Sequence, residues 1–118
     1  MRELVKVLKA LTDQVRIRIL KILEDVNDLC VCEVMQVLDI SQTRASRNLG
    51  ILKDAGFVVD RREGMRIFYS INKEKFNEYH FDLMNLLSGW LNDDDTVRKD
   101  KARLKQVIKS NFRQKCKK

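Results

Sequence analysis

The hydrophobic pattern of the chain changes after Gly56. Before this residue, apolar side chains recur with the spacing of amphipathic helices and are separated by short polar segments. Polar residues suited to capping support the boundaries, since Thr12 and Asp13 precede one apolar run and Ser41 precedes another. Gly56 suits the position just past a helix end, which favours a residue without a Cβ. The pattern predicts four helices, over 3–11, 15–23, 29–38 and 41–54.

Beyond Gly56 the chain first becomes rich in β-branched and aromatic residues. Phe57–Val59 and Ile67–Ile71 are short β-type runs, and the basic segment Arg61–Arg66 between them contains a glycine. This arrangement predicts a hairpin with a basic tip. Helical patterning returns over 72–79, an apolar stripe runs from Phe81 to Leu91, a last helix is expected over 96–112, and residues 113–118 are expected to fray.

These elements predict a mainly helical fold with one β-hairpin, a winged helix-turn-helix of order ααααββαα. We expect a single domain over residues 1–118, with the wing hairpin at about 57–71 and C-terminal dimerisation and tail helices at about 73–112. The helices at 29–38 and 41–54, joined by a short turn, have the proportions of a DNA-binding helix-turn-helix.

Composition narrows the class of protein. The 118 residues include 24 Lys and Arg against 17 Asp and Glu, which gives a formal net charge of +7 and suggests an anionic partner. With 44% hydrophobic residues the chain is expected to fold, and no apolar run is long enough to span a membrane. No export signal is visible, and three cysteines make an odd number, so we expect a cytoplasmic protein with free thiols.

The helix expected at 41–54 has two different faces. At about 100° per residue, Ala45, Leu49 and Leu52 form a core stripe. The opposite face is polar and suits the major groove, with arginine able to pair with guanine and glutamine with adenine. Candidate DNA-contacting residues are Ser41, Gln42, Thr43, Arg44, Ser46, Arg47 and Asn48 on the helix and Arg61, Arg62 and Arg66 on the hairpin. The alternative is a solvated surface, which for the hairpin arginines alone is the simpler interpretation.

The segment Leu29-Cys30-Val31-Cys32-Glu33 carries the candidate ligand chemistry. Thiols at a helix start ionise more readily, and thiolates select soft ions over Mg²⁺ or Ca²⁺. Residues at i and i+2 of a helix point to separate sides, so joint binding by Cys30 and Cys32 would require the first turn to distort. Such a distortion would displace the adjoining DNA-reading helix. The alternative is two small buried hydrophobic side chains.

Together these segments resemble the ArsR/SmtB family of metal-sensing repressors. The matching segments are Leu11–Leu20, Asp28–Val34, Ser41–Leu49, Leu52–Val58 and Arg61–Tyr69. The resemblance implies a homodimer, formed through the first and fifth helices, that binds an inverted-repeat operator and is released by an inducer. Arsenite-responsive members often have Pro in place of Thr43 and His in place of Asn48, so the operator sequence is not transferred by the resemblance.

The Cys-Val-Cys pattern in this family implies trivalent arsenic or antimony as the inducer, bound by Cys30 and Cys32, with no required cofactor. Some arsenite sensors have a third cysteine where this chain has Met35, which leaves the third ligand open; Cys116 is a candidate, and an incidental tail cysteine is the alternative. Cys116 also keeps Cd²⁺ or Pb²⁺ open as inducers, and thiol redox sensing is a further alternative. His80, the single histidine, is more readily explained by packing than by metal binding.

A thiol enzyme is the competing class of function. Neither a Cys-x-x-Cys motif nor a glycine-rich phosphate loop is present, and His80 lies far along the chain from the cysteine pair. We therefore predict a DNA-binding repressor rather than an enzyme. A DNA-binding module that does not respond to metal is the third possibility.

Overall fold

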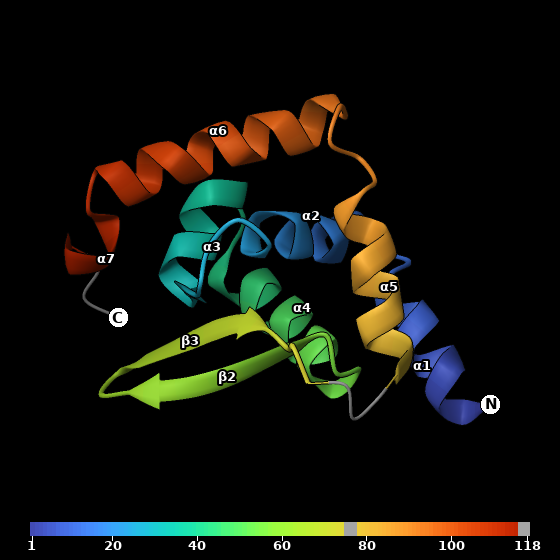
Figure 1. Ribbon diagram of the computed structural model, residues 1–118. Coiled ribbons are helices and arrows are strands. Elements are labelled where there is room, and N and C mark those ends of the chain that lie inside the picture. The colour runs from blue at the N-terminus through green and yellow to red at the C-terminus, as the bar shows by residue number, and fades with distance from the viewer. Residues whose placement is uncertain (75–77, 116–118) are drawn as a thin grey trace.

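The computed structural model of the protein describes residues 1–74 and 78–115 (Figure 1). The elements are, in order, α1 (Arg2–Ala10), α2 (Gln14–Leu23), β1 (Leu29–Cys30), α3 (Val31–Leu38), α4 (Gln42–Asp54), β2 (Val58–Glu63), β3 (Arg66–Ile71), α5 (Glu78–Ser88), α6 (Asp95–Lys109) and α7 (Phe112–Lys115). The fold is the predicted winged helix-turn-helix, in which α3 and α4 form the helix pair and β2 and β3 form the wing. The short elements β1 and α7 are additions to the predicted order.

The predicted helix boundaries rest on local hydrogen bonds. The Asp13 carboxylate accepts from the first backbone amides of α2, and Ser41 Oγ accepts from the Arg44 amide at 3.1 Å. Both side chains therefore satisfy amides that lack a partner within their helix. Gly56 has φ of 93°, a left-handed conformation that suits glycine after the end of α4.

The wing belongs to a three-stranded antiparallel sheet in the order β1-β3-β2. Strands β2 and β3 pair from Val58 opposite Ile71 to Glu63 opposite Arg66, and the turn between them contains Gly64 with φ of 62°. The other edge of β3 pairs with β1, where Cys30 lies opposite Phe68. The helix predicted over 29–38 is thus wrong at its start, because this pairing draws its first two residues into a strand.

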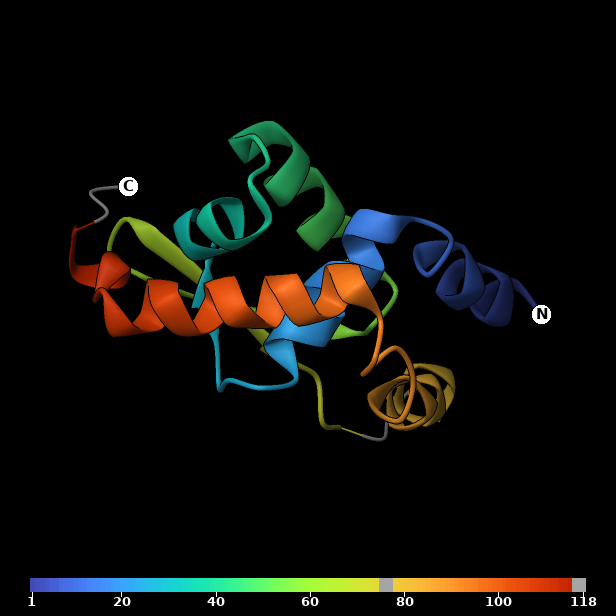
Figure 2. The same cartoon turned by 90° about the horizontal axis from the view of Figure 1, so that it is seen from above.

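The hydrophobic core lies where α2, α3 and α4 meet the base of the wing. Buried residues of α2 form its centre, and Ala45, Leu49 and Leu52 supply the predicted buried stripe of α4. Helix α6 crosses α2 and α3 on the side opposite the wing, whereas α1 and α5 lie together at the far end from the wing tip (Figures 1 and 2). The wing tip therefore lies at the end of the molecule away from α1 and α5 (Figure 1).

Polar contacts fix α6 and α5 on α2. Arg18 binds both carboxylate oxygens of Asp100 at 2.8 and 2.9 Å. Lys21 is fully buried, and its Nζ donates to the carbonyl oxygen of Leu87 at 3.0 Å and contacts the Glu24 carboxylate at 2.8 Å. Burial of a lysine is tolerated because its charge is paired and hydrogen-bonded.

The second half departs from the predicted boundaries in two places. Residues 72–74 are not helical, and the remainder of that expected helix up to α5 lies outside the described residues. The last predicted helix ends at Lys109, where Asn111 takes a left-handed φ of 60° before α7 begins. Among the helices that the structure describes, none is both long and apolar enough to cross a membrane.

Candidate functional site

The two cysteines of the segment Leu29–Glu33, called the thiol segment below, lie in different kinds of structure. Cys30 ends β1 and caps α3, with the extended backbone angles φ −83° and ψ 164°. Cys32 lies in the first turn of α3, is half-buried and is disulfide-bonded, whereas Cys30 is a buried free thiol. The expectation of free thiols is therefore wrong for Cys32. The argument that the pair points to separate sides of one helix is therefore wrong, since only Cys32 is helical.

A cavity of about 170 Å³ brings the two cysteines together. Its lining combines the thiol segment with α4 and the wing: Cys30, Val31, Cys32, Met35, Gln42, Ser46, Met65, Arg66 and Ile67. Three segments that are separate in the sequence thus share one cavity. Any ligand held by the cysteines would lie against side chains of the predicted DNA-reading helix and of the wing.

Cys30 and Glu33 form a reciprocal cap at the start of α3. The Cys30 amide donates to Glu33 Oε1 at 3.0 Å, and the Glu33 amide points to the Cys30 side chain. Burial raises the pKa of the Cys30 thiol above its ordinary value, and the nearby Glu33 carboxylate adds to the rise, although the Glu33 amide opposes it. The predicted ionisation of this thiol by the helix start is therefore outweighed by burial.

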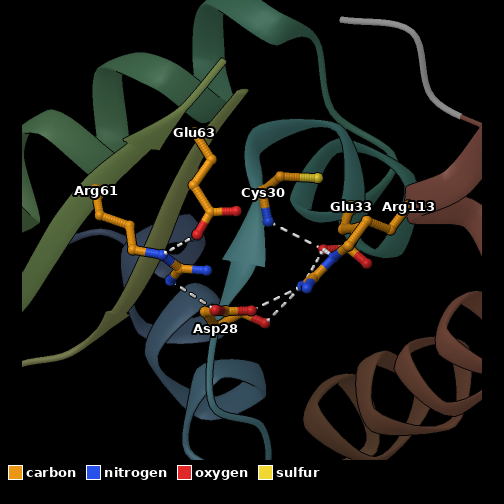
Figure 3. Close-up of polar contacts among 6 residues, drawn as sticks. All are labelled: Asp28, Cys30, Glu33, Arg61, Glu63 and Arg113. Atoms are coloured by element: carbon orange, nitrogen blue, oxygen red, sulfur yellow. Dashed lines mark hydrogen bonds and ion pairs between the residues drawn. The ribbon is translucent and has the colours of Figure 1, made fainter. Parts of the chain in front are cut away.

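An ion-pair network joins the thiol segment to the wing and to the C-terminal helix (Figure 3). Arg113 of α7 donates to Glu33 Oε1 at 3.0 Å and to Asp28 Oδ1 at 2.8 Å. Asp28 also accepts from Arg61 of β2 at 2.7 Å. Burial raises the pKa of Asp28, but hydrogen bonds from Arg61 and Arg113 outweigh it, so this pKa lies below its ordinary value. The Asp28 carboxylate thus joins the wing to the C-terminal helix in its charged form.

Phe68 reinforces the same network from the sheet. The guanidinium carbons of Arg61 and Arg113 lie 4.8 and 4.7 Å from the centre of its ring, within the range of cation–π attraction. Phe68 is also the residue that pairs with Cys30 across the sheet. Sequence reasoning missed Asp28, Glu33 and Arg113, whose only signal was their charge.

Most of the predicted DNA-contacting residues of α4 are exposed. They are Ser41, Gln42, Thr43, Arg44, Ser46 and Arg47. Asn48 differs, because it is buried and its amide accepts from Arg16 at 2.9 Å and donates to the Arg44 carbonyl at 2.9 Å. The Asn48 side chain therefore joins α4 to α2 rather than lying on the exposed face.

The three arginines of the wing differ in their surroundings. Arg62 is exposed, and Arg66 is half-buried beside the thiol cavity. Arg61 is exposed but is held by Asp28 and by Glu63, which accepts from it at 2.8 Å. Arg62 is thus the wing arginine most available to a phosphate.

Potential metal ligands are sparse apart from the cysteine pair. Within residues 1–74 and 78–115, no group of three His, Cys, Asp or Glu side chains converges in a way that would hold a metal ion. Cys116, the predicted additional ligand, lies outside the described residues. His80 is fully buried and packs against Phe57, which agrees with a packing role.

Sequence comparison identifies the family of this fold. Residues 13–59 match the model described as bacterial regulatory protein, arsR family. The arsenic resistance transcriptional regulator ArsR2 of Pseudomonas putida is 37% identical over 91 residues, which cover 75% of this chain and 79% of that relative. The chain belongs to the arsR family. It is accordingly a winged-helix, DNA-binding transcriptional regulator.

Two further relatives are a regulator named for cadmium resistance and a solved winged-helix domain. The cadmium resistance transcriptional regulatory protein CadC homolog of Staphylococcus aureus is 38% identical over 72 residues, 61% of this chain and 60% of that relative. A homodimeric winged helix-turn-helix DNA-binding domain from Mycobacterium bovis, a possible ArsR-family regulator, superposes with a TM-score of 0.64 at 30% identity and covers 80% of this chain and 82% of that one. These relatives are regulators, not enzymes, in agreement with the prediction.

Proposed function

We propose that the protein is a homodimeric repressor that binds an inverted-repeat operator through α4 and the wing and leaves it when As(III) or Sb(III) binds Cys30 and Cys32. The cavity carries this proposal, because its walls include both cysteines together with Gln42 and Ser46 of α4 and Arg66 of the wing. An ion bound to the thiolates would occupy space between the two elements that approach DNA. Relatives named for arsenic resistance support the choice of ion.

The donor set fits a thiophilic ion. Thiolate sulfur binds soft ions strongly, and both cysteines line one cavity. Because Cys32 is disulfide-bonded in the structure, binding requires the reduced protein, in which both thiols lose their protons. The raised pKa of Cys30 makes its deprotonation part of the binding reaction. Cys116 stays the proposed additional thiolate. Cd²⁺ or Pb²⁺ is the second candidate inducer, because a cadmium-named relative matches about as closely.

Release follows if the bound ion favours a different spacing of α4 and the wing. Gln42 and Ser46 lie one turn apart on the exposed face of α4, so a shift of the cavity wall moves the same face that would enter the major groove. A tenfold to hundredfold loss of operator affinity corresponds to about 1.4–2.8 kcal/mol of coupling free energy, within the range of ordinary allosteric coupling.

The dimer is proposed to form through α1 and α5. These helices contact each other, and their surface carries the exposed apolar residues Val5, Leu8, Tyr79 and Leu86, with Trp90 and Leu91 just after α5. Exposed apolar side chains on adjoining helices favour association, and a two-fold dimer matches an inverted repeat. Replacing Leu8 and Leu86 with Glu should yield a monomer in sedimentation velocity; an unchanged dimer would refute this interface.

Fluorescence anisotropy on the protein's own promoter DNA tests the inducer site. The reduced wild type should release the DNA on addition of arsenite, whereas Cys30→Ser/Cys32→Ser should bind equally well and stay bound. Cys116→Ser, measured in the same way, tests whether the proposed additional thiolate is needed for release. Arsenite-driven release from the double variant would refute the proposed site, and parallel titrations with antimonite, Cd²⁺ and Pb²⁺ rank the inducers.

A further inference from the structure

A cavity of about 350 Å³ lies between the end of α2, the end of β3 and α5, and it shares no lining residue with the thiol cavity. Its apolar lining consists of Leu23, Val26, Ile71, Phe81 and Met84. A dry cavity of about 150 Å³ is large enough to bind benzene. The size and the lining therefore suit a small aromatic molecule of one or two rings.

The rim of this cavity is polar and open to solvent. Asn27, Asn85 and Ser88 line the cavity and are exposed. At about 100° per residue, Ser88 lies on the side of α5 opposite Tyr79 and Leu86, which belong to the proposed dimer surface. A dimer formed through α1 and α5 would therefore not cover this side of α5.

Glu24 is the carboxylate in the cavity wall, and only one of its two oxygens is engaged. Its Oε2 contacts the Nζ atoms of Lys21 and Lys101, each at 2.8 Å. Its Oε1 is buried and has no hydrogen-bond partner among the residues that the structure describes. Because two ammonium groups already balance the carboxylate charge, the missing partner is a neutral hydrogen-bond donor rather than a cation.

We propose that this cavity binds a small aromatic molecule with one uncharged N–H or O–H donor. The donor binds Glu24 Oε1, and the ring packs against the apolar lining of the cavity. An aromatic molecule of the same shape without a donor would leave this oxygen unpartnered, which is the basis of selection. The site uses neither cysteine, so the proposal is independent of the proposed inducer site.

A comparison of indole with benzofuran tests the role of the donor. The two molecules have nearly the same shape, but only indole carries an N–H group. Each is titrated into the wild-type protein and followed by the NMR shifts of the backbone amides. Indole should bind saturably with a Kd of about 1 mM or below and shift the amides of the cavity walls, whereas benzofuran should bind at least tenfold more weakly. Equal affinities for the two molecules, or no saturable binding of indole, would overturn the proposal.

A phenylalanine placed in the rim tests the location of the site. Ser88→Phe should fill the opening and lower the indole affinity at least tenfold. Ser110→Phe is the matched control, because Ser110 ends α6 outside this cavity. Both serine hydroxyls donate to the carbonyl oxygen three residues earlier, at 2.7 and 2.9 Å. The control should change the indole affinity less than twofold, and unchanged binding in Ser88→Phe would place indole elsewhere and refute the site. The comparison of indole with benzofuran needs only the wild type, so it decides the proposal even if a variant does not fold.

Discussion

Arg113 and Glu33 form an ion pair of 3.0 Å between the last helix of the structure and the first turn of α3. The Glu33 side chain is only 4% exposed, and its Oε1 also accepts from the Cys30 amide. The chain end that the sequence predicts to fray therefore begins with a residue that supports the thiol segment. Without this guanidinium, the buried carboxylate would keep a single hydrogen-bond donor among the residues that the structure describes, the Cys30 amide.

Replacing Arg113 with Gln should lower the free energy of unfolding by about 1–3 kcal/mol, the usual cost of depriving a buried charged group of its partner. Urea denaturation followed by circular dichroism measures the change. Arg98→Gln, at an exposed position of α6, is the matched control and should stay within about 0.5 kcal/mol of the wild type. Equal stability of the two variants would show that Arg113 does not support Glu33.

Arg61 and Arg62 are neighbours in β2 with different expected roles. Arg61 is engaged by Asp28 and Glu63, whereas Arg62 is exposed. We expect Arg62→Ala to weaken operator binding. The slope of log affinity against log salt concentration should fall by about one for each phosphate that the protein no longer binds. Arg61→Ala should alter the salt dependence less, because its charge is already paired. Anisotropy titrations at several salt concentrations compare the two variants. A larger decrease of this slope in Arg61→Ala than in Arg62→Ala would contradict the assignment of Arg62 as the arginine that binds phosphate.

Asn48 tests the distinction between the reading face and the interior of α4. Asn48→Ala removes the acceptor of Arg16, whose guanidinium also donates to the carbonyl of Ala10 at 2.7 Å. The expected result is a decrease of about 1–3 kcal/mol in the free energy of unfolding, measured with urea. Thr43→Ala, on the exposed face, should instead preserve stability and weaken operator binding. An Asn48→Ala protein that is as stable as the wild type but binds DNA weakly would show that Asn48 acts in DNA binding and not in the interior.

Local sequence signals predicted the helices and their caps because these depend on nearby residues. The Ser41 cap, the Ala45, Leu49 and Leu52 stripe and the turn at Gly56 are all of this kind. The strand at Cys30 was missed because it exists only by pairing with Phe68, far along the chain. The shared cavity was missed for the same reason, since its walls come from three segments that only the folded chain brings together.

Acid should destabilise the protein in two separate ranges. The pKa of Asp28 lies below its ordinary value of 3.8, so the stability that its ion pairs contribute is retained above that value and lost at lower pH. Asp28→Asn should reduce stability at pH 7 and flatten the pH dependence below about pH 4. Urea denaturation at pH 7 and pH 3.5 tests this prediction. If the variant loses as much free energy of unfolding between these pH values as the wild type, other carboxylates cause the acid destabilisation.

His80 should account for the destabilisation in the higher of the two pH ranges. Its Nδ1 and Nε2 are buried and, within the described residues, have no hydrogen-bond partner. Burial lowers the pKa of His80 below its ordinary value of 6.5. The folded state therefore favours the neutral ring, so its contribution is complete above pH 6.5 and declines as the pH falls below 6.5 towards the folded pKa.

We expect the wild type to lose stability between pH 7.5 and pH 5, and His80→Leu to lose less over that interval. At pH 7.5 the variant should be no less stable, because leucine fills the site beside Phe57 without unpaired nitrogens. Urea denaturation at both pH values gives the four free energies needed. The Asp28 contribution changes only below about pH 4. An identical decline in wild type and variant would therefore show that the buried imidazole does not take up the proton that destabilises the fold.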